Sequence, residues 1–164
     1  MVLHSTAGEF AKLKQLIGAI EIALLTTVDG EGHFHTRPVQ TMAVEVDGTL
    51  WFFTDARSEK AFELMRDVRL SLGYADPKRR RYVAISGSGQ LLRDPNKARE
   101  LWSMEQRAYY PDGPEDERLA ILRVQIERAE YWLPSGRAAH MLAGFKARVT
   151  GIPAAVVGRN SKIR

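Results

Sequence analysis

Residues 33–54 read HFHTRPVQTMAVEVDGTLWFFT and carry the strongest signal for the fold. β-Branched and aromatic residues fill two runs, 33–46 and 49–54, and the pair Asp47-Gly48 separates them. Asp-Gly between two such runs is a strong hairpin signal, so we expect two adjacent antiparallel strands. The second run is aromatic on both faces, which predicts a strand that is covered on both sides.

The segments around this hairpin alternate between strand and helix periodicity. We expect further strands at 22–28, 69–75, 82–92 and 119–131, and helices at 6–20, from Ser58 onward, at 96–107 and at 138–149, with an extended tail after them. Gly87 and Gly89 inside one strand predict a bulge or a close approach of another backbone. Strands in hairpin order with helices between pairs favour a mainly β antiparallel barrel over a doubly wound parallel sheet.

Length and composition limit the class of protein. A chain of 164 residues without a long linker predicts a single domain, 1–164. The absence of cysteine excludes a disulfide framework, an iron–sulfur cluster, a Cys-ligated zinc and a thiol nucleophile. No apolar run reaches the roughly 18 residues of a membrane span, and the N-terminus lacks a signal-peptide core. We therefore expect a cytoplasmic protein with no membrane partner.

The net charge of +4 comes largely from a basic run at 78–81 and from the C-terminal tail. The basic run follows Asp76-Pro77 and precedes a strand, so a solvated hairpin turn is favoured over a nucleic-acid patch. A mild basic excess suits an anionic small ligand equally well.

Two histidines, His33 and His35, share one face of the second strand and would form half of a metal site. No third ligand is apparent beside them in the sequence, and surface histidines on a strand are the commoner interpretation. We therefore expect no metal site.

One group of residues points to an anionic ligand. If the hairpin forms, Arg37 on the second strand lies at the same end as Thr54, Ser58 and Lys60, which surround the start of the next helix. A guanidinium, an ammonium, two hydroxyls and free helix N–H groups are what a phosphate monoester needs. From spacing alone the alternative is favoured, in which Arg37 forms a cross-strand ion pair and Lys60 faces solvent.

The chain resembles the general stress protein branch of the pyridoxamine 5′-phosphate oxidase-like, flavin-binding split-barrel superfamily. The resemblance runs in order through nearly the whole chain. It rests on Leu25-Thr26-Thr27-Val28-Asp29-Gly30-x-Gly32, Thr36-Arg37-Pro38-Val39, Leu50-Trp51-Phe52-Phe53-Thr54, Ser58-x-Lys60-x-x-x-Leu64, Ala129-Glu130-Tyr131-Trp132 and the tail from Gly158 to Ile163.

The resemblance implies a six-stranded split barrel that pairs as a homodimer, with two flavin mononucleotide (FMN) sites at the interface. It implies that the phosphate is held at the positions of Arg37, Thr54, Ser58 and Lys60. The flavin ring would lie beside Phe53 and the backbone of Pro38, Val39 and Gln40, with Trp102 or Trp132 flanking it from the partner. Packing in the core or the interface is the alternative role for both tryptophans.

Two departures from the oxidase pattern weaken the predicted phosphate site. The second cation of the oxidases' second strand falls on Met42, and the arginine between their serine and lysine falls on Glu59. Each lost charged hydrogen bond costs about 1.5–3 kcal/mol, so FMN should bind more weakly than in an oxidase. The stretch 134–137 also lacks the histidine of the Arg-x-His pair that grips pyridoxal phosphate, so we do not expect pyridoxamine phosphate oxidation.

The sequence therefore predicts a flavin-binding general stress protein and weak FMN-dependent oxidoreductase, with no catalytic side chain assigned. FAD or deazaflavin could replace FMN, and haem would need His4, His33, His35 or His140 as an axial ligand. The alternative is a non-enzymatic protein that binds flavin or another anionic ligand.

Overall fold

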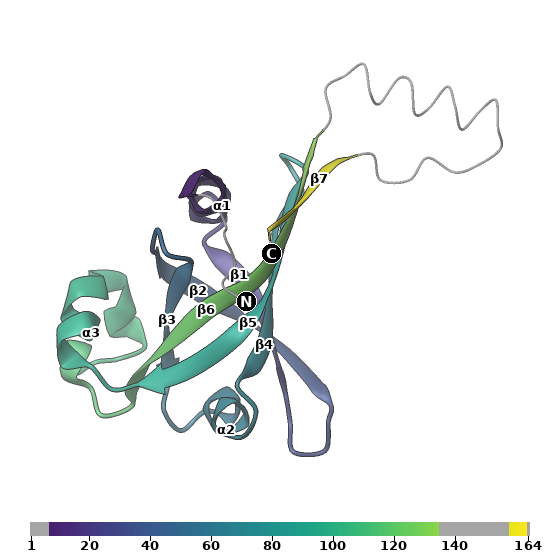
Figure 1. The fold of residues 1–164 in the computed structure, drawn as a ribbon. Coiled ribbons are helices and arrows are strands. Elements are labelled where there is room, and N and C mark those ends of the chain that lie inside the picture. The colour runs from purple at the N-terminus through teal and green to yellow at the C-terminus, as the bar shows by residue number, and fades with distance from the viewer. Residues whose placement is uncertain (1–6, 135–157, 164) are drawn as a thin grey trace, which may run out of the picture.

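The computed structural model describes residues 7–134 and 158–163, and its centre is an antiparallel β-barrel (Figure 1). The strands are β1 (Ile22–Val28), β2 (Phe34–Val44), β3 (Thr49–Asp55), β4 (Arg69–Asp76), β5 (Arg81–Leu92), β6 (Leu119–Pro134) and β7 (Gly158–Ile163). The α-helices are α1 (Ala7–Gly18), α2 (Glu59–Arg66) and α3 (Pro95–Leu101), and two 3₁₀ turns follow, η1 (Met104–Ala108) and η2 (Gly113–Glu115).

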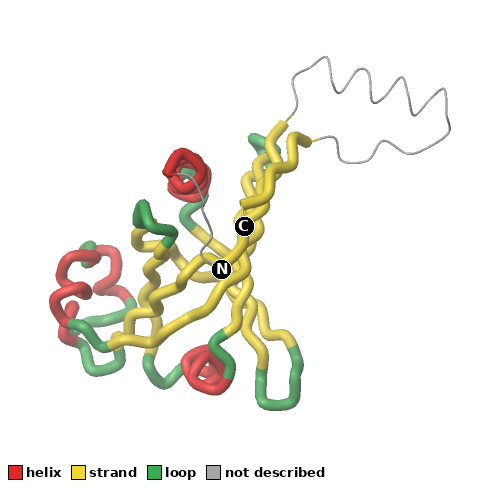
Figure 2. The backbone as a smooth tube through the Cα atoms, viewed as in Figure 1, coloured by secondary structure: helices red, strands yellow, loops and turns green. Residues whose placement is uncertain are grey.

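The sheet closes on itself through β3 and β6. The strand order is β3-β2-β1-β4-β5-β6-β7, and β3 also pairs with β6 from Thr49–Gln125 to Asp55–Leu119. Beyond this stretch the same edge of β6 pairs with β7, from Ala129–Ile163 to Pro134–Gly158. The long strands β5 and β6 therefore extend out of the barrel as a ribbon that β7 joins (Figure 2). The predicted fold class, a six-stranded antiparallel barrel with peripheral helices, is confirmed.

The decisive hairpin forms as predicted, but its loop is longer than two residues. Gly48 N donates to Glu45 O at 3.3 Å and Glu45 N donates to Thr49 O at 2.8 Å. Gly48 has φ +83°, a left-handed conformation that suits glycine. This turn with a left-handed glycine bulge joins strands that keep the right-handed twist.

Gly87 permits the close approach that its position in β5 predicts. A Cβ there would lie 2.2 Å from Gln125 O on β6, and the register of the β5–β6 pair shifts between Ser86 and Gly87. No side chain fits in that space, so glycine is required for the ladder to close at this point.

Both faces of β3 are covered, because alternate residues belong to different hydrophobic clusters. Phe52 is fully buried inside the barrel, where residues of α1 such as Leu13 and Ile17 close one end. Trp51 faces outward and packs with Ala98 of α3 and with Tyr110. The second cluster holds the α3–η2 segment, 95–115, against the outside of the barrel, and this segment forms one wall of the site described below.

The predicted helix at 96–107 is shorter than expected. The α-helix ends at Leu101, and Trp102 adopts an extended conformation with φ −66° and ψ 135°. Ser103 is also extended and begins the 3₁₀ turn η1, in which Gln106 N donates to Ser103 O at 3.1 Å. Serine favours such helix starts over helix interiors, which explains the break. The helix predicted at 138–149 lies outside the described residues.

None of the helices in the described ranges is long and apolar enough to cross a membrane.

Candidate functional site

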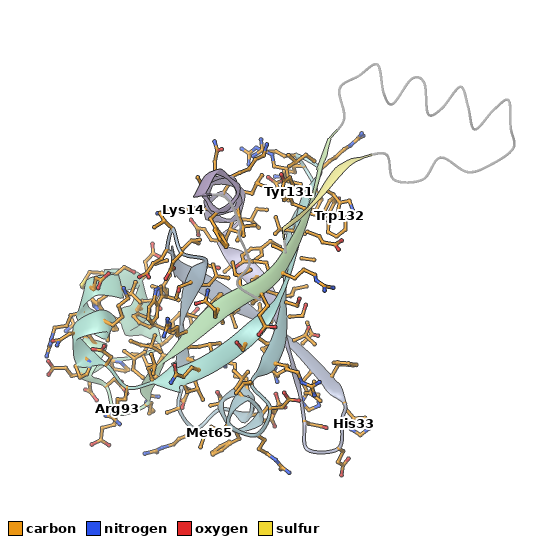
Figure 3. All side chains as sticks on the ribbon, viewed as in Figure 1. Lys14, His33, Met65, Arg93, Tyr131 and Trp132 are labelled. Carbon is orange, nitrogen blue, oxygen red and sulfur yellow. The ribbon has the colours of Figure 1, made fainter. Side chains whose placement is uncertain are left out.

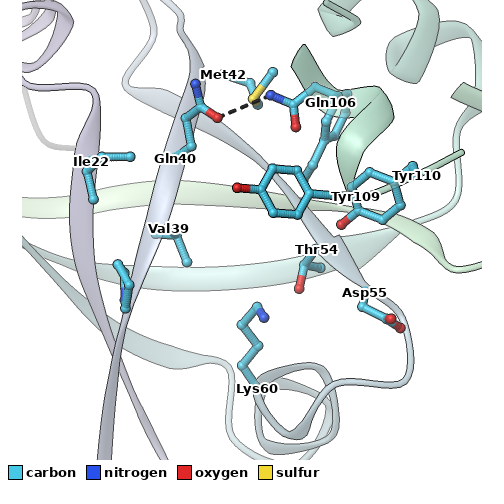
Figure 4. A pocket seen from close by; sticks show the side chains of 12 residues that line it. Ile22, Val39, Gln40, Met42, Thr54, Asp55, Lys60, Gln106, Tyr109 and Tyr110 are labelled. Carbon is cyan, nitrogen blue, oxygen red and sulfur yellow. Dashed lines mark hydrogen bonds between the residues drawn. The ribbon is translucent and has the colours of Figure 1, made fainter. Parts of the chain in front are cut away.

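A cavity of about 480 Å³ lies on the outside of the barrel, between the middle of β2, the end of β3, the start of α2 and the η1 segment (Figure 4). Its volume is within the range of small-molecule sites. The lining residues are Ile22, Pro38, Val39, Gln40, Met42, Phe53, Thr54, Asp55, Lys60, Gln106, Tyr109 and Tyr110. Six of the residues predicted to bind a cofactor are among them: Pro38, Val39, Gln40, Phe53, Thr54 and Lys60.

An irregularity in β2 shapes the upper wall of the cavity. The register of the β2–β3 pair shifts between Thr41 and Ala43, which places an extra residue, Met42, in the strand. Met42 and Gln40 both reach the cavity. Gln106 Nε2 of η1 donates to Gln40 Oε1 at 3.1 Å, so a hydrogen bond ties the outer wall to the barrel (Figure 4).

The lower end of the cavity is the start of α2. Ser58 is the N-cap residue, but its hydroxyl donates to Asp55 O at 2.7 Å and makes no capping hydrogen bond to the helix. The Ser58 hydroxyl also lies 3.4 Å from Thr54 Oγ1, and Thr54 is buried apart from its contact with the cavity. The first-turn N–H groups of α2 are therefore left without a side-chain acceptor from their own cap.

Lys60 is the only cation among the described residues that line the cavity. Burial lowers the pKa of its ammonium, and repulsion from Arg37 lowers it further, while Asp55 and Glu63 oppose the shift. None of the carboxylates in the described ranges lies within ion-pair distance of its Nζ atom. The Lys60 ammonium is thus partly desolvated and has no ion-pair partner among the described carboxylates. An anion in the cavity would stabilise its charge.

Arg37 does not line the cavity, and Glu63 of α2 binds its guanidinium. Arg37 Nη2 donates to Glu63 Oε2 at 2.8 Å, and Nη1 donates to His35 O at 3.0 Å and to Thr27 Oγ1. The alternative role of ion-pair partner is thus what the structure shows, although the partner is on a helix and not on a neighbouring strand.

Glu63 is the centre of this network and is 7% exposed. Its carboxylate also accepts hydrogen bonds from Thr27 Oγ1 at 2.5 Å and from His35 Nδ1 at 2.6 Å. Burial favours the neutral acid, but the hydrogen bonds from Thr27, Arg37 and His35 outweigh burial and hold the pKa of Glu63 below its ordinary value. Glu63 is therefore an ionised, buried carboxylate.

The two predicted tryptophans lie at different distances from the cavity. Trp102 packs behind its wall, with its ring centroid 6.1 Å from that of Phe53. Trp132 pairs with Tyr82, 12 residues along β6 from Ala120, the partner of Thr54. At 3.3 Å per residue this is about 40 Å along the strand. Trp132 lies on the ribbon outside the barrel (Figure 3), so it does not reach the cavity of its own chain.

The structure adds residues that sequence reasoning missed. Gln106, Tyr109 and Tyr110 come from a segment predicted as helix end and loop, and their only sequence signal is a pair of tyrosines in an otherwise polar turn. Burial and the charges of Asp55 and Asp116 raise the pKa of Tyr110 to about 12, so its hydroxyl stays protonated. Tyr109 is 69% exposed and borders the cavity mouth.

Comparisons with known proteins identify the family and the fold. The family described as pyridoxamine 5′-phosphate oxidase like matches residues 8–153. Protein bli-3 of Neurospora crassa is 25% identical over 158 residues, which cover 88% of this chain and 74% of that protein.

Solved structures share the fold. A Clostridium acetobutylicum protein related to general stress protein 26 superposes with a TM-score of 0.69 at 17% identity, covering 79% of this chain and 91% of that one. The general stress FMN/FAD binding protein of Xanthomonas citri gives 0.68 at 26% identity, covering 80% and 92%. The match over most of the length, together with the closed barrel, confirms the resemblance noted in the sequence: the chain belongs to the pyridoxamine 5′-phosphate oxidase-like family.

Proposed function

We propose that this protein binds a flavin nucleotide in the cavity beside Lys60, with FMN as the preferred form. The observation that carries the proposal is a desolvated lysine without a carboxylate partner at the start of a helix, inside a cavity of suitable volume. The similarity to the Xanthomonas citri FMN/FAD binding protein, at 26% identity, supports the same ligand class.

The phosphate would lie at the α2 end of the cavity. Lys60 would supply the charge, and Thr54 and Ser58 would supply hydroxyls, which lie 3.4 Å from each other. The uncapped N–H groups at the start of α2 add the positive end of the helix dipole. Arg37 would act on the phosphate only through its long-range electrostatic potential, since its hydrogen-bond donors are bound to Glu63, His35 and Thr27.

The isoalloxazine ring would lie at the other end, along Pro38, Val39 and Gln40. This part of the cavity offers a flat strand backbone, the aromatic side chain of Phe53 and two amide side chains that are already hydrogen-bonded to each other, Gln40 and Gln106. Aromatic and amide groups of this kind suit a planar heterocycle.

The bound flavin would supply the redox chemistry, and we propose a flavin-dependent oxidoreductase in which the chain fixes the cofactor and excludes water. The position at which the oxidases have a second cation is Met42, which lines the cavity with an uncharged side chain. Glu59 is exposed at the first turn of α2. Because Lys60 is the only cation that lines the cavity within residues 7–134 and 158–163, we expect FMN to bind more weakly than in an oxidase.

A second candidate function is binding without turnover. Apart from Lys60, Asp55 and the two tyrosines, no titratable side chain in the described ranges lines the cavity. Few side chains could therefore act as a general acid or base on a substrate. Reduction of the bound flavin by NADH or NADPH, followed by its absorbance, distinguishes the two: turnover supports the enzyme and flavin binding alone supports the binding protein.

The binding experiment compares FMN with riboflavin, which lacks the phosphate. Titration followed by flavin fluorescence should show that Lys60→Ala weakens FMN binding by roughly tenfold to a hundredfold, the worth of one charged hydrogen bond. Riboflavin binding should change little. Lys78→Ala, on the exposed β4–β5 turn, is the matched control. Unchanged FMN affinity in Lys60→Ala would refute the assigned phosphate position.

A further inference from the structure

Four side chains with metal-binding groups lie together where β1 turns into β2, away from the cavity. Donor atoms of Asp29, Glu31 and His33 all lie within 4.8 Å of one another. His35 Nε2 lies 3.7 Å from Asp29 Oδ2. From the two histidines alone the sequence predicts no metal site, although Asp29 and Glu31 precede them closely in the chain. The fold supplies a third ligand, because the turn after β1 brings Asp29 back against the start of β2.

The separations between these donor atoms suit a small ion. His33 Nδ1 lies 3.2 Å from Asp29 Oδ2 and 3.6 Å from Glu31 Oε2. With bonds of 2.0–2.2 Å, the ligand atoms of a tetrahedral site are about 3.3–3.6 Å apart. The distances among Asp29, Glu31 and His33 therefore need little adjustment for a zinc-sized ion, and imidazole with carboxylate is an ordinary ligand set for it. His35 is not within 4.8 Å of all three and would have to turn toward the ion from its place beside Asp29.

The carboxylate of Asp29 is already oriented. Its Oδ1 atom accepts hydrogen bonds from the backbone N–H groups of Glu31 at 2.8 Å and His33 at 2.9 Å. These bonds fix the turn and leave Oδ2 facing both imidazoles. One ligand atom is thus held in place before any ion arrives.

His35 is oriented from behind by a buried carboxylate. Its Nδ1 atom lies 2.6 Å from Glu63 Oε1, and since an ionised carboxylate only accepts, Nδ1 carries the hydrogen. The other ring nitrogen, Nε2, faces Asp29 Oδ2 at 3.7 Å. This separation is too long for a hydrogen bond. This arrangement of carboxylate, histidine and second ligand is the usual surrounding of a metal-bound histidine.

We propose that Asp29, His33 and His35, with Glu31 as the fourth ligand, form a binding site for a divalent transition metal ion such as zinc. The site is separate from the proposed flavin cavity and does not depend on it. Glu63 links the two regions, because the same carboxylate orients His35 and binds Arg37. A bound ion would therefore stabilise the position of α2 against the β1–β2 hairpin.

The test uses the full chain without an affinity tag, treated with a chelator and then titrated with zinc chloride by calorimetry. We expect one ion per chain, and cobalt(II) in its place should give the visible absorption of a four-coordinate site. His33→Ala and His35→Ala should each weaken zinc binding by at least tenfold. The double variant His4→Ala/His140→Ala, which removes the chain's other two histidines, is the control and should bind as the wild type does.

Three results would overturn the proposal: no binding at micromolar zinc, undiminished binding in His33→Ala and His35→Ala, or loss of binding only in the control. His33 is two-thirds exposed, so its removal leaves the fold intact, and a circular dichroism spectrum checks this for each variant. Cobalt spectra of octahedral type would show a hydrated ion at the surface and would equally contradict the site.

Discussion

Glu63 determines where the Arg37 guanidinium lies, and with it which cation faces the cavity. The sequence predicts Arg37, Thr54, Ser58 and Lys60 at one end of the hairpin, and the structure places Thr54 Oγ1 3.4 Å from the Ser58 hydroxyl and Arg37 near enough to Lys60 to lower its pKa. It also brings in Glu63, 26 residues after Arg37, which binds the guanidinium, so that Arg37 does not line the cavity. Strand pairing can be predicted from periodicity. The direction of a long side chain such as that of Arg37 depends on its partner, which here is Glu63 of α2.

We expect Glu63→Gln to destabilise the fold at neutral pH by about 1.5–3 kcal/mol, because it weakens charged hydrogen bonds to Arg37 and His35 in a buried place. Urea denaturation measures the loss. Glu59→Gln, an exposed change on the same helix, should stay within about 0.5 kcal/mol.

The same variant has a pH signature. The pKa of Glu63 is lower in the folded state than its ordinary value of 4.5. The ionised carboxylate therefore contributes fully to the free energy of unfolding above pH 4.5, and this contribution is lost as the pH falls through the folded-state pKa. The difference in stability between wild type and Glu63→Gln should therefore shrink in acid. A difference that stayed constant down to pH 3 would contradict the ionised, hydrogen-bonded state of Glu63.

At the scale of elements, strands were predicted better than the segments between them. The alternation in β1 to β6 is strong because each strand has a face inside the barrel, and their bounds agree with the sequence to within a few residues. The extra residue Met42 in β2 and the early end of α3 were not predicted. The register shift at Met42 involves the partner strand β3, which local periodicity does not report, and α3 ends early because Ser103 begins the 3₁₀ turn η1.

Gly87 provides a test of strand packing. Gly87→Ala places a Cβ against the Gln125 carbonyl of β6, where the backbone itself would have to move, so we expect a loss of about 1–3 kcal/mol. Gly18→Ala, at the end of α1 with open space around the new methyl group, should cause no loss. Thermal unfolding of the two variants side by side measures the difference, and equal stability would mean that β5 and β6 are further apart than described.

At the scale of the whole molecule, a strip of the barrel surface is apolar and exposed in the described ranges. Leu24 of β1 pairs with Pro38 of β2 and with Gly73 of β4, and Gly73 pairs with Ala84 of β5. These four small or apolar residues form a row across four strands. Leu24 is 53% exposed. Ile22, on the same side of β1, is also part of the cavity lining. The cavity therefore opens at the border of this strip, and we propose that a second copy of the chain covers both.

Light scattering should accordingly give twice the chain mass of 18.5 kDa at micromolar concentration. Leu24→Asp should shift the protein to the monomer and weaken FMN binding together, since the open side of the cavity would lose its cover. Phe62→Asp, at an equally exposed apolar residue of α2, is the control and should remain a dimer. A wild-type monomer that binds FMN fully would show that the cavity needs no second copy.

The double pairing of β6 has a consequence for biosynthesis. Its 119–125 half joins β3 to β5, and all the earlier strands precede it in the chain. During synthesis, the edge strands β3 and β5 therefore lack their partner until residue 125 has left the ribosome. The barrel can close only after that point. A chain that terminates before residue 125 would expose the backbone hydrogen-bonding groups of β3 and β5 and would tend to aggregate. A longer chain can pair both strands with β6 in one step.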